Sequence, residues 1–235
     1  LGAHYTLYIP DLIGAGRSDK PDADYHPDAL AESIGETMRA LDIWGAPIIG
    51  NSLGGYLAMR LSLLHNDAAS RIVNLHSPGL PTARMHLLRF ALALLPRFQS
   101  VLRWLVSRDP ERWVHKNVHY YDETLKSREE HRQYAEPLRD AAGIRAFGCM
   151  LAQTLHVGAM REFERQLRAR KNFPVPLLLL YAERDPMVPP VVGDRLRALI
   201  PDAQFARLEN ASHFAHVDAP QTFLNAALPF LKAGA

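Results

Sequence analysis

The segment Gly-Asn-Ser-Leu-Gly at positions 50–54 constrains the fold of this chain more than any other. An apolar run at residues 47–49 precedes it, and residues 53–64 have the spacing of an amphipathic helix. A strand that turns so sharply into a helix needs glycines, because neighbouring backbone passes where a Cβ atom would clash. Such a turn leaves the Ser52 hydroxyl exposed at the carboxyl edge of a sheet, near a helix N-terminus.

Strand-like and helix-like segments alternate on both sides of this turn. A continuously apolar run at 176–181 is typical of a strand buried on both faces. Strands that alternate with helices at this spacing form a parallel sheet with right-handed crossovers. The sequence therefore predicts an α/β fold with a mostly parallel central sheet flanked by helices. The expected strands are 5–9, 47–50, 71–75, 176–181 and 204–208, and the expected helices are 29–41, 53–64, 191–200 and 221–231.

The segment from 80 to 171 has helical periodicity and no convincing strand. A connection of this length inside a compact fold carries its own structure. We expect a core formed by residues 1–79 and 172–235, with 80–171 inserted as a helical cap. Most of the apolar and aromatic cap residues are expected to pack within it, and a minority to make the pocket apolar.

The charge balance excludes several kinds of partner. The chain has 27 Lys and Arg against 25 Asp and Glu, which gives no argument for nucleic acid or an anionic membrane. The most apolar segment, 87–95, is interrupted by Arg89 and is shorter than the roughly 18 residues that span a bilayer. The single cysteine, Cys149, excludes an internal disulfide and a cysteine-rich metal site. With no recognisable signal peptide, we expect a cytoplasmic protein.

A serine hydroxyl is a poor nucleophile unless a base takes its proton. Of the eleven histidines, His213 lies in a polar loop between the last strand and the last helix, at the same sheet edge as Ser52. His216, three residues later, is the alternative, although its position at the start of a helix favours a packing role. His76 ends a strand near the same edge and is placed to line a pocket.

The base needs a carboxylate to orient it. Asp185 follows the apolar strand that ends at Tyr181, and Glu183 is the alternative, for which we expect an ion pair with an arginine. The chain order Ser52, Asp185, His213 is that of an α/β-hydrolase. The backbone N–H of Leu53 then supplies one donor of an oxyanion hole.

Four segments together resemble the capped α/β-hydrolases: residues 11–21, 50–55, 183–189 and 212–220. The resemblance covers nearly the whole chain apart from the cap. It implies a serine hydrolase that forms an acyl-enzyme on Ser52 and requires no metal or organic cofactor. Haloalkane dehalogenases and epoxide hydrolases of this family use an aspartate nucleophile, and a serine at position 52 argues against both.

The resemblance leaves several substrates open. A small-molecule carboxylic ester with an apolar portion is the commonest class in the family. Asn51, directly before the serine, resembles the residue at that place in enzymes that hydrolyse a carbon–carbon bond in a diketone. Those enzymes usually carry Trp where this chain has Phe214. Lactone hydrolysis is a further alternative. Three arginines are candidates for binding a substrate carboxylate, although surface roles are expected for them: Arg103, Arg108 and Arg145.

The chain also departs from the family pattern. Ser212 stands where the family usually has Gly, and no residue before Leu1 is present to supply the His-Gly segment that gives family members a second oxyanion donor. Losing one such donor costs ~10²–10³ in rate. We therefore expect an N-terminally incomplete hydrolase whose sheet leaves an unpaired apolar edge at or near 5–9. A ligand-binding homologue without turnover is the alternative of another class, which the intact Ser-His-Asp set opposes. The oligomeric state stays open.

Overall fold

The computed structural model describes residues 1–83, 85, 104, 106–118 and 120–233. Within them, four strands form one sheet in the order β1-β2-β3-β4, and all three pairings are parallel. Because all of these strands are parallel, the residues that come directly after each strand meet at one edge of the sheet. The predicted parallel α/β fold is confirmed. The strands are β1 (Ile48–Asn51), β2 (Ile72–Leu75), β3 (Leu177–Ala182) and β4 (Gln204–Leu208).

The helices belonging to the sheet lie within two residues of their predicted positions. The first begins two residues early, because the fixed φ angle of Pro27 suits the first helical turn and His26 Nδ1 accepts the N–H of Asp28 at 3.4 Å. These helices are α1 (Pro27–Ala40), α2 (Leu53–Leu64), α9 (Val191–Leu199) and α11 (Pro220–Lys232). A further short helix, α10 (Ala215–Asp218), is not among the predicted elements.

The prediction of a strand at 5–9 is wrong. Leu7, Tyr8 and Ile9 are exposed, Ile9 by 87% of its surface, and the segment belongs to no strand. It is paired with none of the described strands, and an apolar run without a paired neighbour does not form a strand. Within the described residues β1 is an edge strand, and Ile49 on it is 37% exposed.

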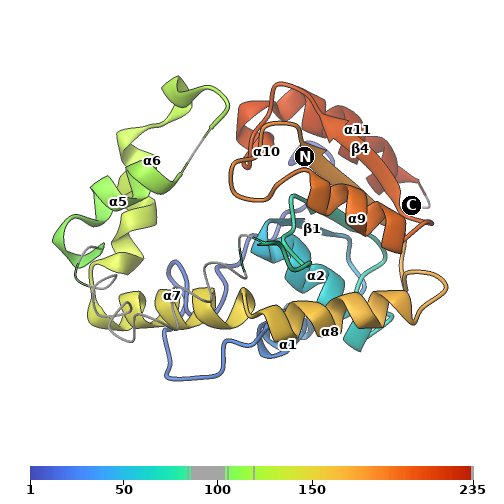
Figure 1. Cartoon of the computed structure of the whole chain (residues 1–235), viewed down its shortest axis with the longest axis horizontal. Helices are drawn as coiled ribbons and strands as arrows, with labels where there is room; N and C mark the ends of the chain where they lie inside the picture. Colours follow the sequence, from blue (N-terminus) through green and yellow to red (C-terminus); the bar gives the residue numbers. More distant parts are fainter. Residues whose placement is uncertain (84, 86–103, 105, 119, 234–235) are drawn as a thin grey trace.

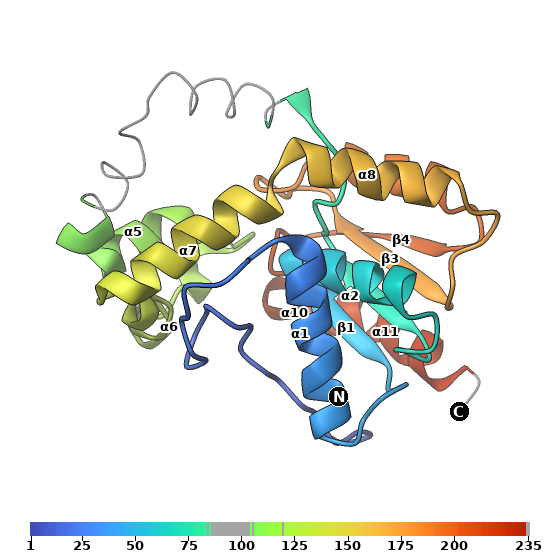
Figure 2. The same cartoon turned by 90° about the horizontal axis from the view of Figure 1, so that it is seen from below.

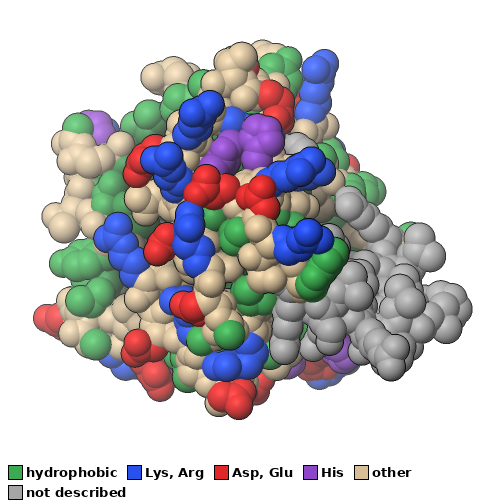
Figure 3. All heavy atoms as spheres, turned by 90° about the vertical axis from the view of Figure 1, so that its left-hand side faces the viewer, with side chains coloured by type: hydrophobic (Ala, Val, Ile, Leu, Met, Phe, Trp, Pro, Cys, Tyr) green, Lys and Arg blue, Asp and Glu red, His purple; other side chains and the backbone are tan. Residues whose placement is uncertain are grey.

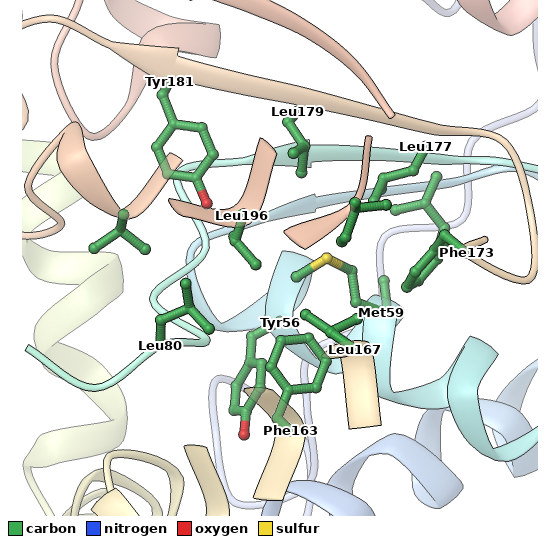
Figure 4. Close-up of a cluster of buried hydrophobic side chains, with 14 of the residues drawn as sticks. Tyr56, Met59, Leu80, Phe163, Leu167, Phe173, Leu177, Leu179, Tyr181 and Leu196 are labelled. Carbon is green, nitrogen blue, oxygen red and sulfur yellow. The ribbon is translucent and has the colours of Figure 1, made fainter. Parts of the chain in front are cut away.

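The core lies on both faces of the sheet, and β3 is buried along its whole length. Its side chains alternate, with Leu179 and Tyr181 on one face and Leu178 and Leu180 on the other. The first face packs against α2, α8 and α9, and the second packs against α11. Figure 4 shows the first of these clusters, with Phe163 among its ring side chains. Figure 2 shows α1 and α2 lying together beside β1.

A set of helices, here called the inserted helices, connects β2 to β3. One of them, α8, packs directly on the core: the Phe163 ring lies edge-on to Tyr56 with centroids 5.0 Å apart. The apolar run 87–95 and Arg103 lie outside the described residues. The inserted elements are α5 (Pro110–Asn117), η1 (Glu123–Leu125), α6 (Arg128–Ala135), η2 (Glu136–Leu138), α7 (Ala141–Thr154) and α8 (Val157–Arg168).

The face that carries α5, α6 and α7 has mixed charge. Figure 3 shows Lys and Arg side chains interspersed with Asp and Glu across it. Ion pairs such as Arg139 with Glu111, 2.6 Å apart, join neighbouring charges there. None of the helices in the described ranges combines the length and apolar character that a bilayer crossing requires.

Candidate active site

Ser52 lies at the junction of β1 and α2 in a backbone conformation that side chains rarely adopt. Its φ is 53° and its ψ is −119°. Its N–H donates to the carbonyl of Leu75 at the end of β2 (2.7 Å), which ties the junction to the sheet. Backbone strain of this kind in a residue other than glycine costs of order 1–3 kcal/mol and is concentrated at functional sites. The sharp turn predicted from the sequence is therefore present, with a serine at its apex.

The turn depends on two glycines, only one of which belongs to the 50–54 pentapeptide. A Cβ atom on Gly50 would lie 2.4 Å from the backbone of Gly54 and Gly55. One on Gly55 would lie 2.5 Å from Asn74 Oδ1, whereas one on Gly54 would meet nothing within 4 Å. The close backbone approach expected from the sequence therefore explains Gly50 and Gly55 but not Gly54.

The structure brings His213 and Asp185 together. His213 Nδ1 lies 2.7 Å from Asp185 Oδ2, and both side chains are buried. The other oxygen, Oδ1, accepts the backbone N–H groups of Met187 (2.7 Å) and Val188 (2.8 Å). Asp185 is thus fixed in place with one oxygen directed at the imidazole.

The two alternatives from the sequence occupy other environments. Glu183 is exposed, and within the described residues it makes neither a contact with His213 nor the ion pair expected with an arginine. His216 is exposed on α10, and its ring lies 6.2 Å from that of Phe214.

His76, which the sequence placed at a pocket lining, is fully buried beside His213. It follows β2, with its Nδ1 3.4 Å from Asn51 Oδ1 and its ring 5.8 Å from that of His213. Its Nε2 is buried without a hydrogen-bond partner. Burial lowers the pKa of His76 to about 4, so the ring is neutral near pH 7. His76 therefore connects the residue before Ser52 to His213 without adding a charge.

Ser52 and His213 lie at the same edge of the sheet, after β1 and β4. Among the described residues the Ser52 hydroxyl has no hydrogen bond to His213, and their connection passes through Asn51 and His76. Leu53 is the first residue of α2, so its N–H has no acceptor within its own helix.

The arginines considered as candidates for binding a substrate carboxylate have partners within the protein. The Arg108 guanidinium lies 4.6 Å from the Trp104 ring centroid, and Arg145 donates to the Lys20 carbonyl at 3.3 Å. In the part of the chain that the structure describes, no group of three His, Cys, Asp or Glu side chains is arranged to hold a metal ion.

Known proteins resemble this chain in sequence and in fold. The profile of a family described as alpha/beta hydrolase fold matches residues 1–220. A 2-hydroxy-6-oxo-6-(2'-aminophenyl)hexa-2,4-dienoic acid hydrolase from Metapseudomonas resinovorans is 26% identical over 245 residues, covering 99% of this chain and 76% of that protein. A serine hydrolase involved in carbazole degradation has a TM-score of 0.67 at 22% identity, covering 95% of this chain and 78% of that one. A thermophilic esterase from Thermogutta terrifontis has a TM-score of 0.69 at 18% identity, with the same coverages of 95% and 78%.

Proposed function

Because the chain belongs to the α/β-hydrolase fold family, we propose that it is a serine hydrolase with Ser52 as nucleophile, His213 as general base and Asp185 as the orienting acid. The observation that carries the proposal is the buried hydrogen bond of 2.7 Å between His213 Nδ1 and Asp185. It fixes the imidazole so that Nε2 is the nitrogen left to accept a proton. Ser52 has the strained backbone and lies at the same sheet edge, and its hydroxyl is the one from which His213 would take the proton.

The reaction proposed is acyl transfer to water. Ser52 Oγ attacks the substrate carbonyl carbon while its proton passes to His213 Nε2. The tetrahedral intermediate collapses, the bond to the leaving group breaks, and His213 returns the proton to that group. Water then attacks the acyl-enzyme, with His213 as base, to release the carboxylic acid and regenerate Ser52. The Leu53 N–H is placed to donate to the developing oxyanion.

We propose a small-molecule carboxylic ester with an apolar portion as the substrate, and the inserted helices as the cap over it. Hydrolysis of a carbon–carbon bond in a diketone is the second candidate. Two observations favour it: Asn51 precedes the nucleophile, and the Metapseudomonas relative is named for a hexadienoic acid substrate. The same three side chains serve both reactions, which differ in the bond that breaks.

The test compares two substrates and a set of variants. Turnover of p-nitrophenyl butyrate and of a 2-hydroxy-6-oxohexa-2,4-dienoic acid is followed by absorbance, and the larger kcat/KM decides the substrate class. Ser52→Ala and His213→Ala should each reduce kcat by ~10³-fold or more, and the double variant should lose little further, because the residues act as a unit. Asp185→Asn should fold yet lose most activity, because the amide favours the wrong tautomer.

Glu183→Gln is the matched control for Asp185→Asn, since it changes an exposed carboxyl two residues away. It should retain activity. Near-wild-type turnover by Ser52→Ala would refute the proposal, as would a Glu183→Gln variant as damaged as Asp185→Asn.

A further inference from the structure

The Asp218 carboxylate, at the end of α10, holds the residue directly before His213. Its Oδ2 accepts both the backbone N–H of Ser212 (2.7 Å) and the Ser212 hydroxyl (2.5 Å). This hydroxyl is present because residue 212 is Ser, where the α/β-hydrolases that this chain resembles usually have Gly. Two hydrogen bonds therefore fix the backbone from which the His213 side chain projects. The sequence alone gave no signal for Asp218 beyond its place five residues after His213.

The second oxygen of the same carboxylate binds the inserted helices. Asp218 Oδ1 accepts the backbone N–H of Tyr121 (3.0 Å), which lies between α5 and η1. The Tyr121 hydroxyl donates to Asn210 Oδ1 (3.2 Å), and the Arg184 guanidinium lies 5.3 Å from its ring centroid. Tyr121 thus contacts the loops that carry His213 and Asp185. In Figure 1 the inserted segment around α5 and α6 reaches across toward α10.

Tyr120, the residue before Tyr121, also connects the inserted helices to His213. The Tyr120 ring is buried edge-on against Phe214 with centroids 5.4 Å apart, and Phe214 lies in the same way against His213 at 5.3 Å. The Tyr120 hydroxyl donates to Glu130 on α6. The inserted helices therefore reach His213 by two routes, one through packed rings and one through the Asp218 carboxylate.

We propose that Asp218 is a positioning residue for His213, and that it makes the orientation of the base depend on the seating of Tyr121. One carboxylate holds the loop of the base with one oxygen and the inserted segment with the other. Release of the segment removes part of the support of the His213 loop. Displacement of a catalytic group by about 1 Å can cost ~10²-fold in rate. This inference rests on the proposed role of His213 as the base.

Three variants separate the two halves of the arrangement. Asp218→Ala removes all three hydrogen bonds. Asp218→Asn keeps one oxygen, which can accept the backbone N–H of Ser212 or that of Tyr121 but not both, because the two donate to different oxygens of Asp218. Ser212→Gly removes the hydroxyl that donates to Asp218 Oδ2 and keeps the bond from the backbone N–H. The matched control is Asp202→Ala, because Asp202 Oδ2 also accepts a distant backbone N–H, that of Phe173 at 3.1 Å.

Two measurements are made on each variant. One is kcat and KM for p-nitrophenyl butyrate. The other is the downfield ¹H resonance of the His213 Nδ1–H in its bond to Asp185, assigned by its absence from His213→Ala. Asp218→Ala should lower kcat by about tenfold or more with KM changed less than about twofold, and should broaden or abolish the resonance. Asp218→Asn should be intermediate, Ser212→Gly milder, and Asp202→Ala unchanged in both, whatever its Tm.

Retention of the resonance and of kcat by Asp218→Ala, with only a fall in Tm, would overturn the proposal. The resonance also separates the two inferences. If the wild type hydrolyses neither substrate but loses the resonance on Asp218→Ala, the positioning role stands and the proposed function fails. If the substrates are hydrolysed and the resonance is insensitive to Asp218, the proposed function stands and the positioning role fails.

Discussion

Acidification from pH 6.5 to pH 4 protonates exposed histidines, but the surroundings of His76 oppose its protonation. The ring is fully buried, and burial is the main reason that its pKa falls from the ordinary 6.5 to about 4. Asp185 acts in the opposite direction, while the nearby His213 and His216 lower the pKa further. Between pH 6.5 and pH 4 the unfolded chain therefore holds a proton at this position that the folded protein does not.

The magnitude follows from the shift. One pKa unit corresponds to about 1.4 kcal/mol, so a shift from 6.5 to about 4 corresponds to about 3 kcal/mol. A group whose pKa as a base is lowered by folding favours the unfolded state as the pH falls. The contribution of His76 to the free energy of unfolding is thus fully retained above pH 6.5. It declines through the window down to pH 4, by up to about 3 kcal/mol.

The assay is urea unfolding, followed by tryptophan fluorescence at several pH values from 7 to 4, for wild type and His76→Gln. The variant should lose less stability across the window than wild type, by up to about 3 kcal/mol, whatever its stability at pH 7. His4→Gln, at an exposed histidine, is the control and should follow wild type. Equal slopes for wild type and His76→Gln would refute the reasoning.

Two further predictions concern the turn and the core. Gly50→Ala should abolish activity or folding, because its Cβ would lie 2.4 Å from backbone. Gly54→Ala, whose Cβ would meet nothing within 4 Å, should leave activity and Tm nearly unchanged. Equal damage in the two variants would contradict the geometry. Phe163→Ala should lower the free energy of unfolding by ~3–5 kcal/mol in a urea titration, because the ring is fully buried, and Leu64→Ala, at a side chain that is 43% exposed, should cost clearly less.

The strands and helices with strong local patterns were predictable from the sequence. The continuous apolar run of β3 and the helix directly after Ser52 lie within one residue of their predicted bounds. The absence of a strand at 5–9 was not predictable, because the composition of this segment favours a strand, whereas a strand also requires a paired neighbour. Local propensity carries no information about which neighbours a segment has.

The residues of the candidate site were likewise predictable only in part. Asp185 and His213 could be placed at one edge because a parallel sheet brings its loops together, and the structure does bring those two side chains together. The burial of His76 and the two-sided role proposed for Asp218 could not be predicted, because both depend on contacts between segments far apart in the chain. Glu183 failed as an ion-pair partner for a similar reason: the sequence shows that a charge is present but not which charges are near it.

The pairing of β2 with β3 has a consequence for the order in which the molecule assembles. Ser52 and His76 belong to one run of chain and Asp185 and His213 to another, and about a hundred residues separate the two strands that join these runs. Closing so long a loop costs entropy before any contact repays it, and such non-local pairing slows folding. During refolding, helices such as α2 should therefore form before β2 and β3 meet. Recovery of activity should then lag behind recovery of the far-ultraviolet circular dichroism signal, and it should report on the closure of that one pair of strands.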